Sequence, residues 1–81
     1  MINYDGLYTL IGYNFKRIRK EKIKVTQEKL AEELNLSRSF ISHIESPKVN
    51  KGISIDTLFL ISQKYNIDIR EFFQGYEKFL K

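Results

Sequence analysis

The sequence contains no cysteine, which excludes disulfide bonds, thiolate-bound metals and a catalytic cysteine. Its longest apolar run, residues 58–61, is far shorter than the roughly 20 residues that a membrane-spanning helix requires. The chain does not open with a basic segment followed by a long apolar one, so we expect no secretory signal. These absences predict a small, soluble, intracellular domain that works in the cytoplasm without a membrane partner.

Proline and glycine are also scarce, with one and four residues among 81. Hydrophobic residues make up 42% of the chain and charged residues 30%, which is typical of a globular protein and excludes a disordered one. A chain of this length forms one domain, so residues 1–81 are predicted to fold as a single unit.

Positive charge is concentrated in the first two thirds of the chain. Fourteen Lys and Arg against ten Asp and Glu give a net charge of +4. Residues 1–53 hold ten basic and six acidic side chains, whereas residues 54–81 hold four of each, so the first segment carries all of the excess. This asymmetry favours a nucleic-acid-binding face, and less strongly an anionic membrane surface.

Apolar residues recur at helical spacing, and no segment shows the strict alternation of a half-buried strand. The spacing predicts a first helix over 8–23, in which Gly12 is a local weakness, and a second that opens at Thr26 and stops at Asn35. Further helices are expected over 38–46 and 55–66 and from Ile69 onward. The predicted fold class is therefore all-α, with five short helices.

The predicted helix ends have specific sequence signals. Oxygen-bearing side chains suited to accept hydrogen bonds from free backbone N–H groups stand at four helix starts, Thr26, Ser37, Ser54 and Asp68. Asparagine tolerates the left-handed conformation that ends helices, and it stands at positions 35 and 66. Pro47 is expected to end the third helix, because proline cannot continue the hydrogen-bond ladder.

The second and third helices together form a helix-turn-helix pattern. About three residues join them, which is too few for the helices to lie antiparallel, and small Ala31 stands where they would press together. Ile41 and Ile44 hold the third helix to the core, so its outward residues are Arg38, Ser39, Ser42 and His43. None of the four is acidic, as a helix entering the major groove requires, because carboxylates would repel the flanking phosphates.

These segments resemble the Cro/C1-type (XRE) helix-turn-helix family of phage and bacterial transcription regulators. The resemblance is carried by T-Q-E-K-L-A at residues 26–31, by L-S-R-S-F-I-S-H-I-E at residues 36–45, and by the apolar pattern at 58–67. It covers residues 11–73 and leaves 74–81 as a C-terminal helical extension. The family implies a compact lambda-repressor-like DNA-binding domain.

The resemblance also implies roles for individual residues in binding double-stranded DNA. Arg38, Ser39, Ser42 and His43 match base-reading positions, and Arg38 is suited to a bidentate contact with guanine. The positions that match phosphate contacts are Thr26, Gln27, Ser37, Lys48, Asn50 and Lys51.

Two features depart from the family pattern. Ser46-Pro47 stands where the family commonly has glycine, and the first helix carries one extra residue before Thr26. The family pairs an arginine of the first helix with the glutamate of the third, here Glu45. Counting back from Gln27 selects Lys20 as its partner, whereas the apolar register selects Arg19, and we favour Arg19.

The chain has more apolar residues near its C-terminus than one core needs. The surplus comprises Phe59, Leu60, Phe73, Tyr76, Phe79 and Leu80. Left exposed, they would form a larger patch than monomers usually show, which favours a homodimer interface. The alternative is that the tail folds back, with Tyr4, Leu7 and Tyr8, over its own core.

Catalysis and metal binding are not supported by the sequence. It contains no set of nucleophile, base and orienting residue and no glycine-rich phosphate loop, so we expect no enzyme and no cofactor. His43 is the only histidine and has no partner at ligand spacing, so no metal site is expected. Around the first helix, Lys16, Arg17, Arg19, Lys20, Lys22 and Lys24 point in several directions, and we expect one or two phosphate contacts from them at most.

The sequence therefore predicts a dimeric, sequence-specific regulator that binds a roughly palindromic operator. Within the same family, a restriction–modification controller protein, a phage-type repressor or an antitoxin remains open. Outside it, the alternative is a protein-interaction module that binds a peptide or protein through its apolar tail.

Overall fold

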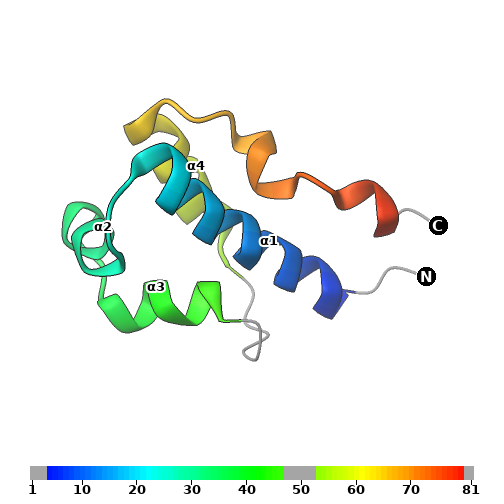
Figure 1. The fold of residues 1–81 in the computed structure, drawn as a ribbon, viewed down its shortest axis with the longest axis horizontal. Coiled ribbons are helices and arrows are strands. Elements are labelled where there is room, and N and C mark those ends of the chain that lie inside the picture. Colours follow the sequence, from blue (N-terminus) through cyan, green and yellow to red (C-terminus); the bar gives the residue numbers. More distant parts are fainter. Residues whose placement is uncertain (1–3, 47–52, 80–81) are drawn as a thin grey trace.

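The computed structural model describes residues 4–46 and 53–79, and these residues are helical apart from short connections (Figure 1). Four α-helices are present: α1 (Tyr4–Ile18), α2 (Gln27–Leu34), α3 (Arg38–Glu45) and α4 (Ile55–Tyr65). A π-helical turn, η1 (Arg19–Ile23), continues α1, and two 3-10 turns, η2 (Ile69–Phe73) and η3 (Tyr76–Phe79), follow α4. Within the described ranges there is no strand, and no helix is long and apolar enough to cross a membrane.

The predicted caps are confirmed. The side-chain oxygen of Thr26 accepts a hydrogen bond from the backbone N of Lys29 at 3.0 Å, and Ser37 Oγ accepts one from the backbone N of Phe40 at 3.1 Å. Ser54 and Asp68 cap α4 and η2 in the same manner. Asn35 and Asn66 end α2 and α4 in the left-handed conformation. These six helix ends are therefore determined by local side chains.

The prediction of a fifth α-helix is wrong. Residues 69–79 instead form two short 3-10 turns, interrupted at Gly75, whose φ is 94°. Asn14 explains the interruption, because its side-chain amide donates to the carbonyl oxygens of Phe72 at 2.9 Å and Gln74 at 3.0 Å. In an α-helix these carbonyl oxygens would accept hydrogen bonds from backbone N–H groups of the same helix. In the tail they accept hydrogen bonds from Asn14 of α1 instead.

The first helix also differs from its prediction. It begins at Tyr4 and not at residue 8, and it passes into the π-helical turn at Arg19. Gly12 is not a weak point of this helix but the place where α1 meets α3. A Cβ atom there would lie 2.3 Å from the backbone oxygen of Ile44, so only glycine permits this approach.

The core is built on the buried face of the central helix α1. In Figure 1, α2 and α3 lie on one side of α1 and the tail runs along another. Phe15 of α1 meets Phe72 of the tail with ring centroids 6.1 Å apart, and both are almost fully buried. The remaining buried apolar residues are Ile11, Ile18, Leu30, Ala31, Leu34, Ile41, Leu58, Ile61 and Ile67. This shared core fixes α3 relative to the rest of the molecule.

Candidate nucleic-acid interface

The turn between α2 and α3 is short and internally hydrogen-bonded. Asn35, in the left-handed conformation, redirects the chain, and the backbone N of Leu36 donates to the carbonyl of Ala31 at 2.8 Å. Ala31 is buried, so the two helices approach closely at its small side chain. Figure 1 shows α2 almost end-on while α3 is seen from the side, so their axes cross steeply. This is the geometry of a helix-turn-helix motif.

The outward face of α3 is polar and free of carboxylates. Arg38, Ser39 and His43 are exposed and Ser42 is half-buried, whereas Ile41 is fully buried. The one acidic residue of α3, Glu45, points inward with 9% of its surface exposed. The exposed face therefore presents hydroxyls, an imidazole and a guanidinium, all of which are compatible with a groove lined by phosphates.

Glu45 is neutralised inside the protein by Arg19. Arg19 Nε lies 2.6 Å from Glu45 Oε2 and Nη2 lies 3.0 Å from Oε1, a bidentate pair with little exposure to water. The third nitrogen, Nη1, donates to the carbonyl oxygen of Val25 at 2.7 Å. Lys20, the partner that counting along the sequence would select, is exposed. The pair ties η1 to α3 and to the segment that leads into α2.

Gln27 joins this network. Its side-chain Nε2 donates to Glu45 Oε1 at 3.0 Å, so the amide is held at the N-terminal end of α2. A phosphate at that position would have to use the second N–H of the same nitrogen. Thr26 and Ser37 are exposed at the starts of α2 and α3. Because their oxygens accept from the backbone, their hydroxyl protons stay available to donate to a phosphate.

The π-helical turn explains the extra residue before Thr26. In a π-helix the hydrogen bond spans one residue more than in an α-helix, and the backbone N of Lys24 donates to the carbonyl oxygen of Arg19 at 2.7 Å. One residue is thereby absorbed without rotating the first part of the helix out of register. Arg19 consequently keeps the position that the apolar spacing of Ile11 and Ile18 gives it.

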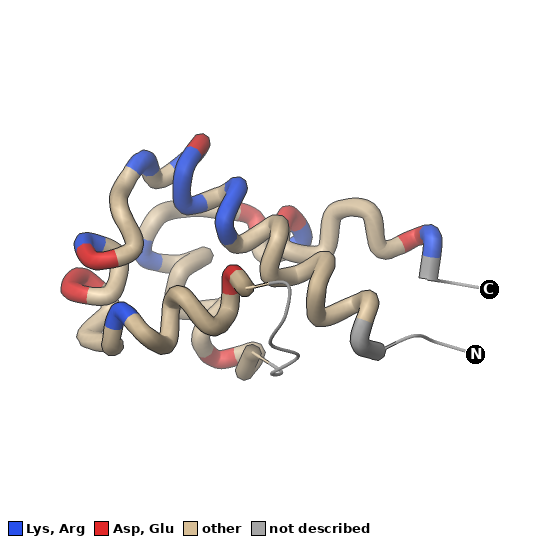
Figure 2. Tube along the Cα trace, turned by 60° about the horizontal axis from the view of Figure 1, so that its bottom comes forward, with Lys and Arg blue, Asp and Glu red and all other residues tan. Residues whose placement is uncertain are grey.

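The basic residues of the first helix are distributed between internal contacts and solvent. Arg17 donates to Gln74 Oε1 at 3.1 Å, and Lys22 pairs with Glu71 at 2.8 Å, so both hold the tail against α1. Lys16, Lys20 and Lys24 are exposed, with no ion pair among the described residues. Figure 2 shows basic positions gathered along the end of α1 and η1, whereas the Lys or Arg residue of α3 is Arg38.

Part of the predicted interface falls outside the described residues. Lys48, Asn50 and Lys51 lie there, as does Pro47 of the corner after α3. Besides Tyr13 on α1, two exposed apolar side chains were missed by the sequence analysis, Phe40 on α3 and Ile55 on α4. Phe40 directly precedes the buried residue Ile41, and Ile55 stands four residues before Phe59, so the sequence spacing could have identified both.

The surplus apolar residues are divided between two locations. Phe59 and Leu60 on α4 are 54% and 44% exposed, and Tyr76 in the tail is also exposed. Phe73 instead packs against the core, so it follows the alternative in which the tail folds back. The side chain of Phe79 and residue Leu80 lie outside what the structure describes. Exposed apolar surface therefore remains on α4, next to a tail that is partly folded back.

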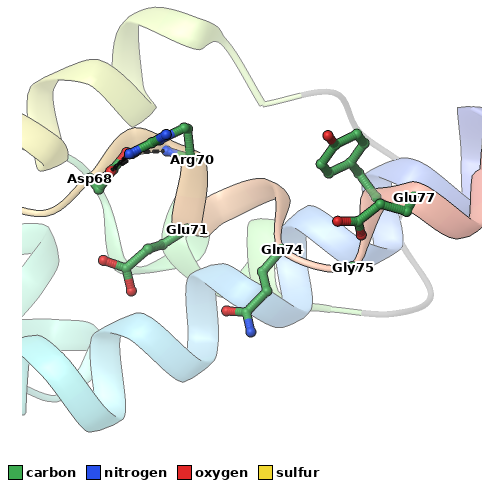
Figure 3. A pocket seen from close by; sticks show the side chains of 7 residues that line it. Asp68, Arg70, Glu71, Gln74, Gly75 and Glu77 are labelled. Carbon is green, nitrogen blue, oxygen red and sulfur yellow. Dashed lines mark hydrogen bonds and ion pairs between the residues drawn. The ribbon is translucent and has the colours of Figure 1, made fainter.

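A hollow of about 350 Å³ lies along the tail, away from α3 (Figure 3). Two of the three carboxylates that line it have internal partners: Asp68 lies 2.6 Å from Arg70, and Glu71 pairs with Lys22. Hydrogen bonds from Arg70 lower the pKa of Asp68 to about 2. The described residues contain no group of three or more potential metal ligands. The α3 face is thus the surface whose geometry points to a macromolecular ligand.

Comparison with known proteins identifies the family. Residues 12–78 match the family described as helix-turn-helix domain. The control protein C.MunI of Mycoplasma sp is 37% identical over 67 residues, which are 83% of this chain and 88% of that protein. The control protein C.BamHI of Bacillus amyloliquefaciens is 34% identical over 67 residues, 83% of this chain and 80% of that protein.

A phage protein extends this comparison. The immunity repressor protein of Bacillus phage phi105 is 48% identical over 44 residues, which are 54% of this chain but 30% of the repressor. The search of solved structures gave no significant match. The resemblance to Cro/C1-type regulators is confirmed by these relatives, and the chain belongs to the helix-turn-helix domain family, as a DNA-binding transcriptional regulator and not an enzyme.

Proposed function

We propose that this regulator binds a roughly palindromic operator as a homodimer, with α3 of each protomer in the major groove. The observation that carries the proposal is the outward face of α3. This face presents Arg38, Ser39, Ser42 and His43, and it contains no carboxylate. In this arrangement the four side chains read base edges, and Arg38 contacts a guanine. Such a regulator would act in the cytoplasm, where bacterial DNA is found.

Phosphate contacts on both sides of α3 would supply most of the affinity. Thr26, Gln27 and Ser37 stand at the starts of α2 and α3, where free N–H groups and the helix dipoles favour anions. Lys48, Asn50 and Lys51 would contact the backbone on the other side of the groove. These contacts position the protein, and the α3 face supplies specificity.

The exposed apolar stripe of α4 is the proposed dimer interface. Ile55 and Phe59 lie one turn apart on the helix, with Leu60 beside them, and all three are largely exposed. A twofold axis through this stripe would bury it and would place the two recognition helices about 34 Å apart, one turn of B-DNA. Tyr76 would extend the interface if the tail of the partner lies alongside.

Selection of bound sequences from a random duplex library, at about 150 mM salt, tests the proposal. We expect a palindromic motif whose half-sites are about 10 base pairs apart. The Arg38→Ala variant should select a motif that is degenerate at one base position in each half-site. The proposal would be contradicted if no motif is recovered and binding disappears as the salt concentration rises. The protein would then bind DNA only nonspecifically, through its positive charge.

A second candidate is more specific: a controller protein of a restriction–modification system. It is favoured by the two control proteins, because the matched region covers 80% or more of each of them. The selected motif distinguishes it from a phage-type repressor. A controller should bind the DNA upstream of its own gene and of a neighbouring endonuclease gene, and the absence of the motif from both places would exclude this role.

A further inference from the structure

Phe40 is an aromatic residue on the recognition helix that the core does not use. Its side chain is 39% exposed, and it does not belong to the apolar residues packed against the core cluster. The neighbouring positions on the outer face of α3, Ser39 and His43, are polar and exposed. A single exposed phenylalanine needs no special explanation elsewhere on a surface, but here it lies within the face proposed to enter the groove.

The local geometry fixes Phe40 in the first turn of α3. Its backbone N donates to Ser37 Oγ at 3.1 Å, so its place relative to the helix start is set by the cap. His43 follows three residues later, which puts the two side chains on adjacent positions of the helix surface. The first turns of a recognition helix are those that approach base edges.

The chemistry of the major groove offers one apolar partner to such a side chain. The C5-methyl group of thymine projects into the groove, and no other standard DNA base presents an apolar group there. We propose that Phe40 is a specificity-determining residue that packs against the methyl group of one thymine in each half-site. This inference rests on the proposed operator binding, and it adds an apolar contact to the polar ones of Arg38, Ser39, Ser42 and His43.

Replacement of single thymines by uracil tests the contact, because it removes one methyl group and leaves base pairing unchanged. Operator duplexes from the selection experiment would each carry uracil at one thymine position per half-site. The unmodified protein should lose about fourfold in affinity per half-site at one position, the amount expected for one buried methyl group. Phe40→Ala should bind the thymine and uracil duplexes of that position equally well, whereas Phe40→Leu should retain part of the preference.

Tyr13→Ala is the matched control, because Tyr13 is also an exposed aromatic but lies on α1 beside Lys78 of the tail. It should discriminate between thymine and uracil as the unmodified protein does. The inference is overturned if the unmodified protein shows no loss at any uracil position, or if Phe40→Ala retains the full preference. In both cases operator binding itself would stand. Failure of the unmodified protein to select any sequence would instead overturn the proposed function, and this inference with it.

Discussion

At the scale of single residues, the ion pair between Arg19 and Glu45 stabilises the fold and also holds α3, the helix that carries the proposed DNA-binding face. The pair is bidentate and buried, and Glu45 also holds Gln27. Glu45→Ala would leave the Arg19 guanidinium without its partner in a site from which water is largely excluded. We expect a loss of about 3–5 kcal/mol in the free energy of unfolding, measured by urea denaturation.

Glu32→Ala is the control for that measurement, since Glu32 forms an exposed pair with Lys29 at 3.3 Å. Its removal should cost less than about 1 kcal/mol. Equal destabilisation by the two substitutions would mean that the buried pair contributes no more than a surface one.

Arg38 and Lys51 are expected to affect DNA binding in different ways. Arg38→Ala should cost about 1–3 kcal/mol on the selected operator and little on random DNA, because a base contact is lost. Lys51→Ala should weaken binding to both, and should lower the slope of log K against log salt by about one. Equal losses on operator and random DNA for Arg38→Ala would exclude this arginine as a base reader.

At the scale of elements, the crossing of α1 and α3 depends on one glycine. Alanine is normally the better helix former by about 1 kcal/mol, so an exposed site would gain stability from Gly12→Ala. Here the added Cβ would meet the backbone oxygen of Ile44 at 2.3 Å, and backbone cannot rotate away as a side chain can. We expect a net destabilisation of about 1–3 kcal/mol, seen as a lower Tm, and an unchanged or higher Tm would contradict this reading.

Helix starts and the helix-turn-helix motif could be predicted from the sequence because their signals are local. Thr26, Ser37 and Ser54 mark helix starts, because the side-chain oxygen of each accepts a hydrogen bond from the backbone N three residues ahead. The tail could not be predicted in this way. Its apolar spacing is helical, but the side-chain amide of Asn14, some sixty residues away in the sequence, donates hydrogen bonds to the carbonyl oxygens of Phe72 and Gln74. Tertiary hydrogen bonds that override a local pattern leave no local signal.

The candidate site shows the same division. The apolar register was sufficient to select Arg19 over Lys20, because packing holds a helix face more firmly than residue counting indicates. The π-helical turn that makes this register possible could not be predicted, since it is visible only as one residue too many before Thr26. The approach of α3 to Gly12 was equally hidden, because it depends on a contact between residues far apart in the sequence.

At the scale of the whole molecule, the exposed stripe on α4 should control assembly. Phe59→Glu would place a charge at the centre of the proposed twofold interface. Because Phe59 is 54% exposed in the single chain, the fold itself should survive, with an unchanged far-UV circular dichroism spectrum. We expect sedimentation equilibrium to show a dimer for the unmodified protein and a monomer for Phe59→Glu.

The operator is the more sensitive reporter of the same change. Two linked recognition helices bind the second half-site at a high effective concentration, an advantage of about 10²–10⁴ that a monomer loses. Phe59→Glu should therefore bind the full operator scarcely better than a single half-site. Tyr13→Glu, which changes a still more exposed aromatic residue on α1, should bind as the unmodified protein does. Tyr76→Glu then tests whether the tail belongs to the interface together with the exposed stripe of α4. Partial loss of dimer would place the tail in the interface, whereas no loss would confine the interface to α4. A Phe59→Glu protein that still sediments as a dimer would show that the protomers associate through another face.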